Sequence, residues 1–93
     1  MADLEKSPKL RRRAGLKRLA GLLDQLRALG ELREARPGTF LHGSRPLLHF
    51  HYSADGSIVA DIQLSGRGFT PFDVSDEAGQ QEVLAVIEDL VGG

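Results

Sequence analysis

Two stretches of alternating apolar residues, joined by a glycine-containing turn, constrain the fold of this chain most strongly. They cover residues 47–53 and 58–65, and each places its apolar side chains at every second position. Alternation with a period of two is typical of a strand that is buried on one face. The two apolar sets must share a face of a hairpin, because a slip of one residue would turn one set to solvent.

The length of the turn decides the register of this hairpin. A two-residue loop would pair Phe50 with Asp61, which breaks the apolar face. A three-residue loop over 54–56, with Gly56 in the left-handed conformation, keeps that face intact. The apolar pairs are then Tyr52 with Ile58, Phe50 with Ala60, and Leu48 with Ile62. On the opposite face the same register predicts that His49 lies across from Asp61.

Shorter strand signals lie on both sides of the hairpin. The turn at Pro37-Gly38 separates residues 32–36 from 39–42, and a further strand over 69–74 follows the glycines at 66 and 68. Pro71 places this last strand at an edge of the sheet, because proline cannot donate a ladder hydrogen bond. We therefore predict an antiparallel meander of four or five strands over residues 32–74.

A helix is expected before the sheet and another after it. Ser7-Pro8 is typical of a helix start, and leucines spaced three and four apart predict a basic amphipathic helix over 8–29. Residues 1–6 are expected to form a flexible tail. Ser75 or Asp76 can cap an acidic amphipathic helix over 76–91. Its apolar stripe consists of Val83, Val86, Ile87, Leu90 and Val91.

These elements predict one α+β domain over residues 1–93. Both helices have an apolar stripe and the sheet has one apolar face, so we expect two layers, with the N- and C-terminal helices packed on the same face in the order α-β-β-β-β-β-α. A content of 41% hydrophobic and 27% charged residues fits a globular chain. No apolar run approaches the ~18 residues of a membrane span.

The composition also restricts the chemistry and the setting. Because the chain has no cysteine, disulfides, thiolate metal sites and cysteine nucleophiles are excluded. No glycine-flanked serine elbow or complete glycine-rich phosphate loop occurs, which favours a protein without enzymatic activity. We expect a cytoplasmic protein that does not associate with membranes, and the excess of arginine over lysine favours a bacterial source.

His49 and His51 form the first candidate site. They point to the same side of their strand, and with Asp61 opposite they offer two imidazoles and a carboxylate, enough for a divalent metal with open positions. The alternative is an ordinary cross-strand pair on a solvated face. We therefore predict no resident cofactor unless a divalent metal binds here. His42 would be a natural third ligand, but pairing of Phe40 with Leu48 on the apolar face places it on the other side of the sheet; a slip of one residue would bring it to the site.

Seven positive charges within residues 6–18 form the second candidate site. Such a cluster can neutralise phosphates in a salt-dependent and largely sequence-independent way, whereas the absence of interleaved aromatic residues gives no support for base stacking. The alternatives are a solvated face or pairing with the acidic second helix, within one chain or between two. The candidate nucleic-acid-binding residues are Lys9, Arg11, Arg12, Arg13, Lys17 and Arg18.

The charge is divided between the two halves of the chain. Residues 1–45 contain eleven Lys and Arg against five Asp and Glu, and residues 46–93 contain one against eight, so the halves are about +6 and −7. With a second sheet face carrying Leu41, Leu47 and Val59, this asymmetry favours a small, non-enzymatic interaction module. Its expected partner is another protein or, through self-association, a second copy. Nucleic-acid binding and metal binding are the alternatives.

Three short stretches carry a resemblance to known sequences: 37–40, 47–51 and 60–62. They resemble short bacterial proteins that have no assigned function. The resemblance covers roughly residues 32–90. It implies a small α+β fold and no particular activity.

Overall fold

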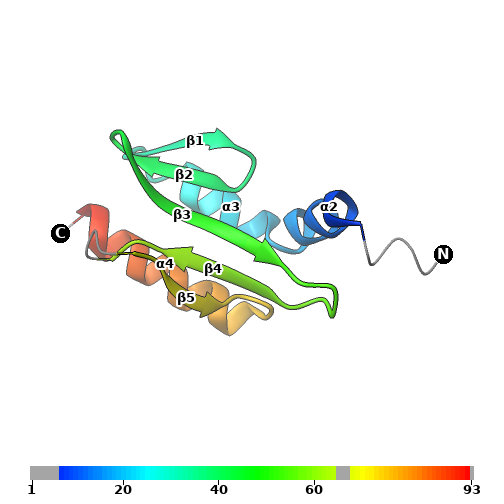
Figure 1. The fold of residues 1–93 in the computed structure, drawn as a ribbon. Helices are drawn as coiled ribbons and strands as arrows, with labels where there is room; N and C mark the ends of the chain where they lie inside the picture. The colour runs from blue at the N-terminus through cyan, green and yellow to red at the C-terminus, as the bar shows by residue number, and fades with distance from the viewer. Residues whose placement is uncertain (1–6, 65–67, 93) are drawn as a thin grey trace.

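The computed structural model describes residues 7–64 and 68–92. It confirms the α+β fold, in which helices precede and follow a five-stranded sheet along the chain (Figure 1). The sheet order is β1-β2-β3-β4-β5, and every neighbouring pair is antiparallel. The elements are α2 (Pro8–Arg18), α3 (Ala20–Arg27), β1 (Leu32–Arg36), β2 (Thr39–His42), β3 (Arg45–Tyr52), β4 (Ile58–Ile62), β5 (Thr70–Asp73) and α4 (Glu77–Gly92). The predicted tail at 1–6 lies outside the described residues.

The helices cover one face of the sheet and leave the other uncovered. In Figure 1, α3 and α4 lie behind the strands, whereas α2 lies beyond the end of β3. The core between the layers is apolar and includes Leu26, Phe40, Ile62, Val74 and Ile87, each at most 1% exposed. We call the uncovered side the open face. Among the described residues, no helix is both long and apolar enough to cross a lipid bilayer.

The helix predicted over 8–29 is two helices in the structure. The break falls at Leu19, whose φ of −92° and ψ of 4° are not helical and whose side chain is fully buried. It allows α2 to pack on β3 while α3 packs on β1 and α4. The leucine spacing is regular across the break, so the sequence pattern gave no sign of it.

The central hairpin has the predicted register. Tyr52 pairs with Ile58, and His49 pairs with Asp61. The loop over 54–56 is closed by a hydrogen bond from the Ser53 N–H to the Ser57 carbonyl, 3.0 Å long. Gly56 has a φ of +91°, as the three-residue loop requires.

The expectation that Leu47 lies on the open face is wrong. The pairing between β2 and β3 shifts by one residue, because Phe40 pairs with Leu48 but Leu41 pairs with Pro46. The extra residue in this bulge is Leu47, and its side chain is 6% exposed and belongs to the core. Leu41 and Val59 are partly exposed, as expected for the open face.

The first helix is held to the sheet by a close contact and by two arginines. Gly15 is buried against Tyr52 so tightly that a Cβ there would lie 2.2 Å from the Tyr52 ring. Arg11 donates from Nε to the Tyr52 carbonyl at 3.1 Å. Arg18 donates to the carbonyls of Gly56 and Ser75, the latter at 2.7 Å. These contacts fix α2 at the end of the central hairpin.

Candidate functional site

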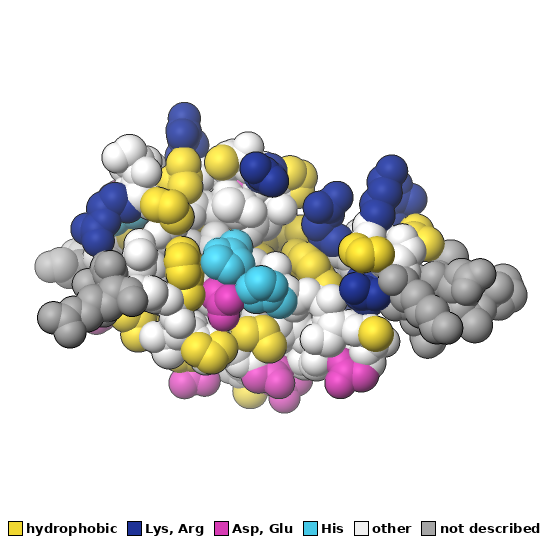
Figure 2. Space-filling view, viewed as in Figure 1, with side chains coloured by type: hydrophobic (Ala, Val, Ile, Leu, Met, Phe, Trp, Pro, Cys, Tyr) yellow, Lys and Arg dark blue, Asp and Glu magenta, His cyan; other side chains and the backbone are white. Residues whose placement is uncertain are grey.

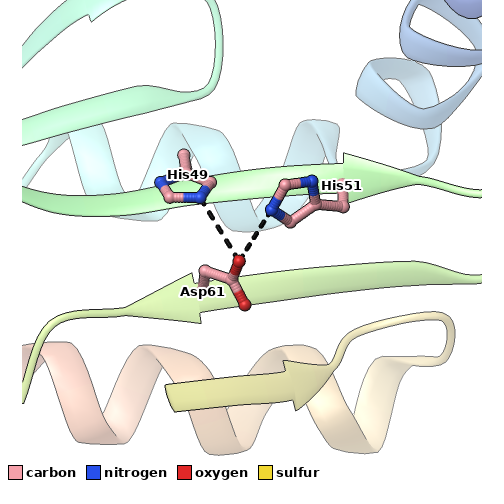
Figure 3. A group of neighbouring side chains, drawn as sticks. All are labelled: His49, His51 and Asp61. Carbon is pink, nitrogen blue, oxygen red and sulfur yellow. Dashed lines mark ion pairs between the residues drawn. The ribbon is translucent and has the colours of Figure 1, made fainter. Parts of the chain in front are cut away.

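His49, His51 and Asp61 converge at the centre of the open face. The histidines come from β3 and the aspartate from β4, and both imidazoles point toward the same carboxylate oxygen (Figure 3). The distance from Nε2 to Asp61 Oδ2 is 2.7 Å for His51 and 3.3 Å for His49. One ligand atom from each residue lies within 4.8 Å of the other two. The structure therefore brings together the three residues that the hairpin register predicted.

The three side chains differ in exposure. Asp61 is 18% exposed, His49 34% and His51 62%, so the site opens to solvent on the side of His51. Figure 2 shows histidines beside an acidic side chain on this face, with hydrophobic side chains around them. The site is a shallow surface arrangement rather than an enclosed cavity.

Phe69 forms part of this site, although the sequence analysis did not single it out. Its ring lies 4.6 Å from the His49 ring at a tilt of 57°, and the two imidazoles meet edge to face at 5.0 Å. In the structure Pro71 lies opposite Asp61, and Phe69, two residues before Pro71, lies on the same side of the sheet. No sequence pattern set the register of this strand pair, so no signal pointed to Phe69. The aromatic ring limits the rotation of His49 and shields one side of it.

The distances can be compared with those around a bound ion. With nitrogen and oxygen ligands at about 2.1 Å, a tetrahedral zinc ion places its ligand atoms about 3.4 Å apart. The separation from His49 Nε2 to Asp61 Oδ2, 3.3 Å, already matches this value. The separation from His51, 2.7 Å, has to lengthen by about 0.7 Å to reach it. His51 is 62% exposed, so solvent rather than packed side chains surrounds most of its ring.

His42 lies away from this group, as predicted. It is exposed in β2, two residues after Phe40, whose side chain faces the core. Alternation along the strand therefore directs His42 to the side opposite the site.

The six candidate nucleic-acid-binding residues do not form one site. Arg11 and Arg18 hold α2 to the sheet through backbone carbonyls. Lys9, Arg12 and Arg13 lie along a cleft of about 570 Å³ between α2 and the β1–β2 turn. Lys17 is exposed on α2 and does not line this cleft. Since α4 packs on α3 and β5 whereas α2 packs on β3, the fold does not favour pairing of the basic and acidic helices within one chain.

Comparisons of this chain with family models, with curated proteins and with solved structures found no match. The resemblance of residues 32–90 to short bacterial proteins therefore stays a prediction.

Proposed function

We propose that this chain is a non-enzymatic binding module whose open face binds a divalent transition-metal ion through His49, His51 and Asp61. One observation carries the proposal: ligand atoms of all three side chains lie within 4.8 Å of one another. All three come from adjacent, paired strands, whose backbone hydrogen bonds hold them in place without a ligand.

The donor set favours zinc or a similar ion. Imidazole nitrogens suit zinc, copper, nickel and iron, whereas calcium and magnesium prefer oxygen ligands. Three protein ligands leave at least one position for water or for a group from a binding partner. To bind a metal through Nε2, each imidazole must be neutral and carry its proton on Nδ1. Acid protonates Nε2 as well and should therefore weaken binding.

A zinc titration of protein without a histidine tag tests this proposal. Calorimetry should give one zinc ion per chain for the wild type. Asp61→Asn keeps the size of the side chain but removes its charge, and it should weaken binding by at least about tenfold. His49→Ala should do the same. His42→Ala is the matched control, because it removes an exposed imidazole from the other side of the sheet, and it should bind as the wild type does.

The imidazole resonances identify the ligands directly. Zinc should shift the ring signals of His49 and His51 and leave those of His42 in place. Wild-type affinity in Asp61→Asn, or an equal loss in His42→Ala, would contradict the proposal.

Self-association through the open face is a second candidate. It is supported by Phe69, a large hydrophobic residue 38% exposed beside the site, and by the partly exposed Leu41 and Val59. Figure 2 also shows Lys and Arg along one long edge of the molecule and Asp and Glu along the other, a distribution that suits contact between copies. The cytoplasm of a bacterium, which the composition favours, is the proposed setting.

Sedimentation equilibrium distinguishes a dimer from a 10.1 kDa monomer. The wild type should dimerise, and Phe69→Ser should shift the equilibrium toward the monomer. A strict monomer at all protein and salt concentrations would exclude this second candidate and leave the metal proposal untouched.

A further inference from the structure

The cleft between α2 and the β1–β2 turn combines positive charge with an apolar floor. Lys9, Arg12 and Arg13 contribute charge from α2, and Arg36 contributes it from the end of β1. Figure 2 shows Lys and Arg side chains gathered over α2 and the adjacent part of the sheet. Among the described residues, none of these four cations has an ion-pair partner. Their charge is therefore available to a ligand.

The acid nearest in sequence to Arg36 is committed elsewhere. Glu34 accepts two hydrogen bonds from Arg27, 2.6 and 3.0 Å long, and one from the Gly38 N–H at 2.9 Å. The hydrogen bond from Arg27 holds the pKa of Glu34 below its usual value, so this carboxylate stays ionised and paired. It positions the β1–β2 turn, and its charge is paired with that of Arg27.

The floor of the cleft is made by Leu16, Phe50 and Tyr52. Tyr52 is half-buried, and burial raises the pKa of its hydroxyl while Arg12 acts in the opposite direction, which indicates that the guanidinium lies near the phenol. A Cβ added to Gly38 would lie 3.3–3.4 Å from the side chains of all three floor residues. Gly38 therefore lies beside all three floor residues and forms part of the wall of the cleft.

The basic segment over residues 6–18 contains no aromatic residue, but the fold places aromatic residues from another strand beside it. Phe50 and Tyr52 belong to β3, far from α2 in sequence, but they line the same cleft as Arg12. Sites for single-stranded nucleic acid combine cations, which bind the phosphates, with aromatic side chains, on which the bases stack. A volume of about 570 Å³ is within the range of small-molecule sites.

We propose that this cleft binds a nucleotide, with its phosphates between α2 and Arg36 and its base against Tyr52 and the small exposed part of Phe50, which is 9% exposed. Four cations on two walls suit a ligand with more than one negative charge. The apolar floor would contribute nothing to the binding of inorganic phosphate, but it would strengthen the binding of a ligand with a planar base. The nucleotide could be free or part of a single strand, since both present the same chemistry. This site is separate from the metal site, and neither proposal depends on the other.

Affinities for ADP, pyrophosphate and adenosine test the two halves of the cleft. We expect ADP to bind at least about tenfold more tightly than either pyrophosphate or adenosine, because only ADP uses both the cations and the floor. In amide NMR spectra, ADP should shift signals along the first turns of α2 and at Gly38 and Thr39, but not at His51. Absence of ADP binding at millimolar concentration, or equal affinity for pyrophosphate, would overturn the proposal.

Charge variants separate a defined site from diffuse attraction. Arg12→Gln and Arg36→Gln should each weaken ADP binding by about tenfold, since each loses a charge-assisted contact. Arg33→Gln is the matched control: it removes the same charge from β1, but Arg33 does not line the cleft. All three residues are exposed, so their variants should fold. An equal loss in Arg33→Gln and Arg36→Gln would refute the site.

A short oligodeoxyadenylate distinguishes the two sources of the nucleotide. If the strand binds more tightly than ADP and shifts the same amides, the ligand is single-stranded nucleic acid. If ADP binds at least as tightly, the ligand is a free nucleotide. Oligonucleotide binding that leaves Gly38 and Thr39 unshifted would contradict the assignment to this cleft.

Discussion

The packing of α2 on the sheet can be tested by replacing Gly15 with alanine. The new Cβ would lie 2.2 Å from Cδ1 and 2.4 Å from Cε1 of Tyr52, whereas carbon atoms in contact stay about 3.5–4.0 Å apart. The ring or the helix must therefore move by more than ~1 Å. The Tyr52 hydroxyl lies beside the β1–β2 turn, since a Cβ at Gly38 would lie 3.4 Å from it.

The expected magnitude follows from two opposing contributions. Forcing a methyl group into a packed contact costs about 1–3 kcal/mol, while replacing glycine by alanine within a helix gains about 1 kcal/mol. Given the severity of the overlap, we expect Gly15→Ala to lower the free energy of unfolding by about 1–2 kcal/mol. Gly21, in α3, is a matched control, since a Cβ there meets nothing within 4 Å. Gly21→Ala should stabilise the protein by up to about 1 kcal/mol.

Urea unfolding followed by circular dichroism measures both changes. The test is completed in a Tyr52→Ala background, where the ring is gone and Gly15→Ala should stabilise the helix as Gly21→Ala does. The resulting double-mutant cycle isolates the steric contribution. Equal shifts of the unfolding free energy by Gly15→Ala and Gly21→Ala in the wild-type background would refute the reasoning, because the overlap with Tyr52 would then be without consequence.

Three further outcomes are expected. Leu47→Ala should cost about 2–4 kcal/mol of stability in urea unfolding, as for a core leucine, and an effect no larger than that of Leu41→Ala would contradict the burial of Leu47. The hydrogen bond from Arg27 holds the pKa of Glu34 below its usual value of 4.5. This hydrogen bond therefore stabilises the folded protein fully above pH 4.5, and the stabilisation is lost as the pH falls through the lower pKa that Glu34 has in the folded state. Thermal melts should show that the difference in melting temperature between the wild type and Glu34→Gln decreases as the pH falls below 4.5. A difference that stays constant with pH would contradict this role of Glu34. Zinc at a concentration that saturates the wild type should raise the melting temperature of the wild type by more than that of Asp61→Asn.

The central hairpin and its site could be predicted from sequence because few registers satisfy the pattern. Each apolar set recurs at every second residue, and a single loop length aligns the two sets, so the position of Asp61 relative to His49 followed from counting. Pro71 marked the edge strand for a similar local reason. In each case the relevant interaction is set within a few residues along the chain or by one strand pairing.

The departures arose where tertiary contacts decide local structure. The break at Leu19 divides a regular leucine pattern, and it is favoured because α2 and α3 pack on different parts of the fold. Leu47 is buried because the pairing of β2 with β3 shifts by one residue, and two adjacent leucines gave no sign of which one would occupy the bulge. Neither the helix break nor the bulge changes the spacing of apolar residues in its own segment.

The nucleotide cleft was beyond prediction from sequence for a related reason. The basic segment contains no aromatic residue. The aromatic side chains of the cleft belong to β3, and only the fold brings them beside α2 and the β1–β2 turn. The cleft exists only while α2 is held against Tyr52, and Gly15 permits that contact. Gly15→Ala should therefore weaken ADP binding although every cation of the cleft remains, whereas Gly21→Ala should leave it unchanged. Unaltered ADP affinity in Gly15→Ala would show that the cations act without the floor, and the ligand would then be held by charge alone.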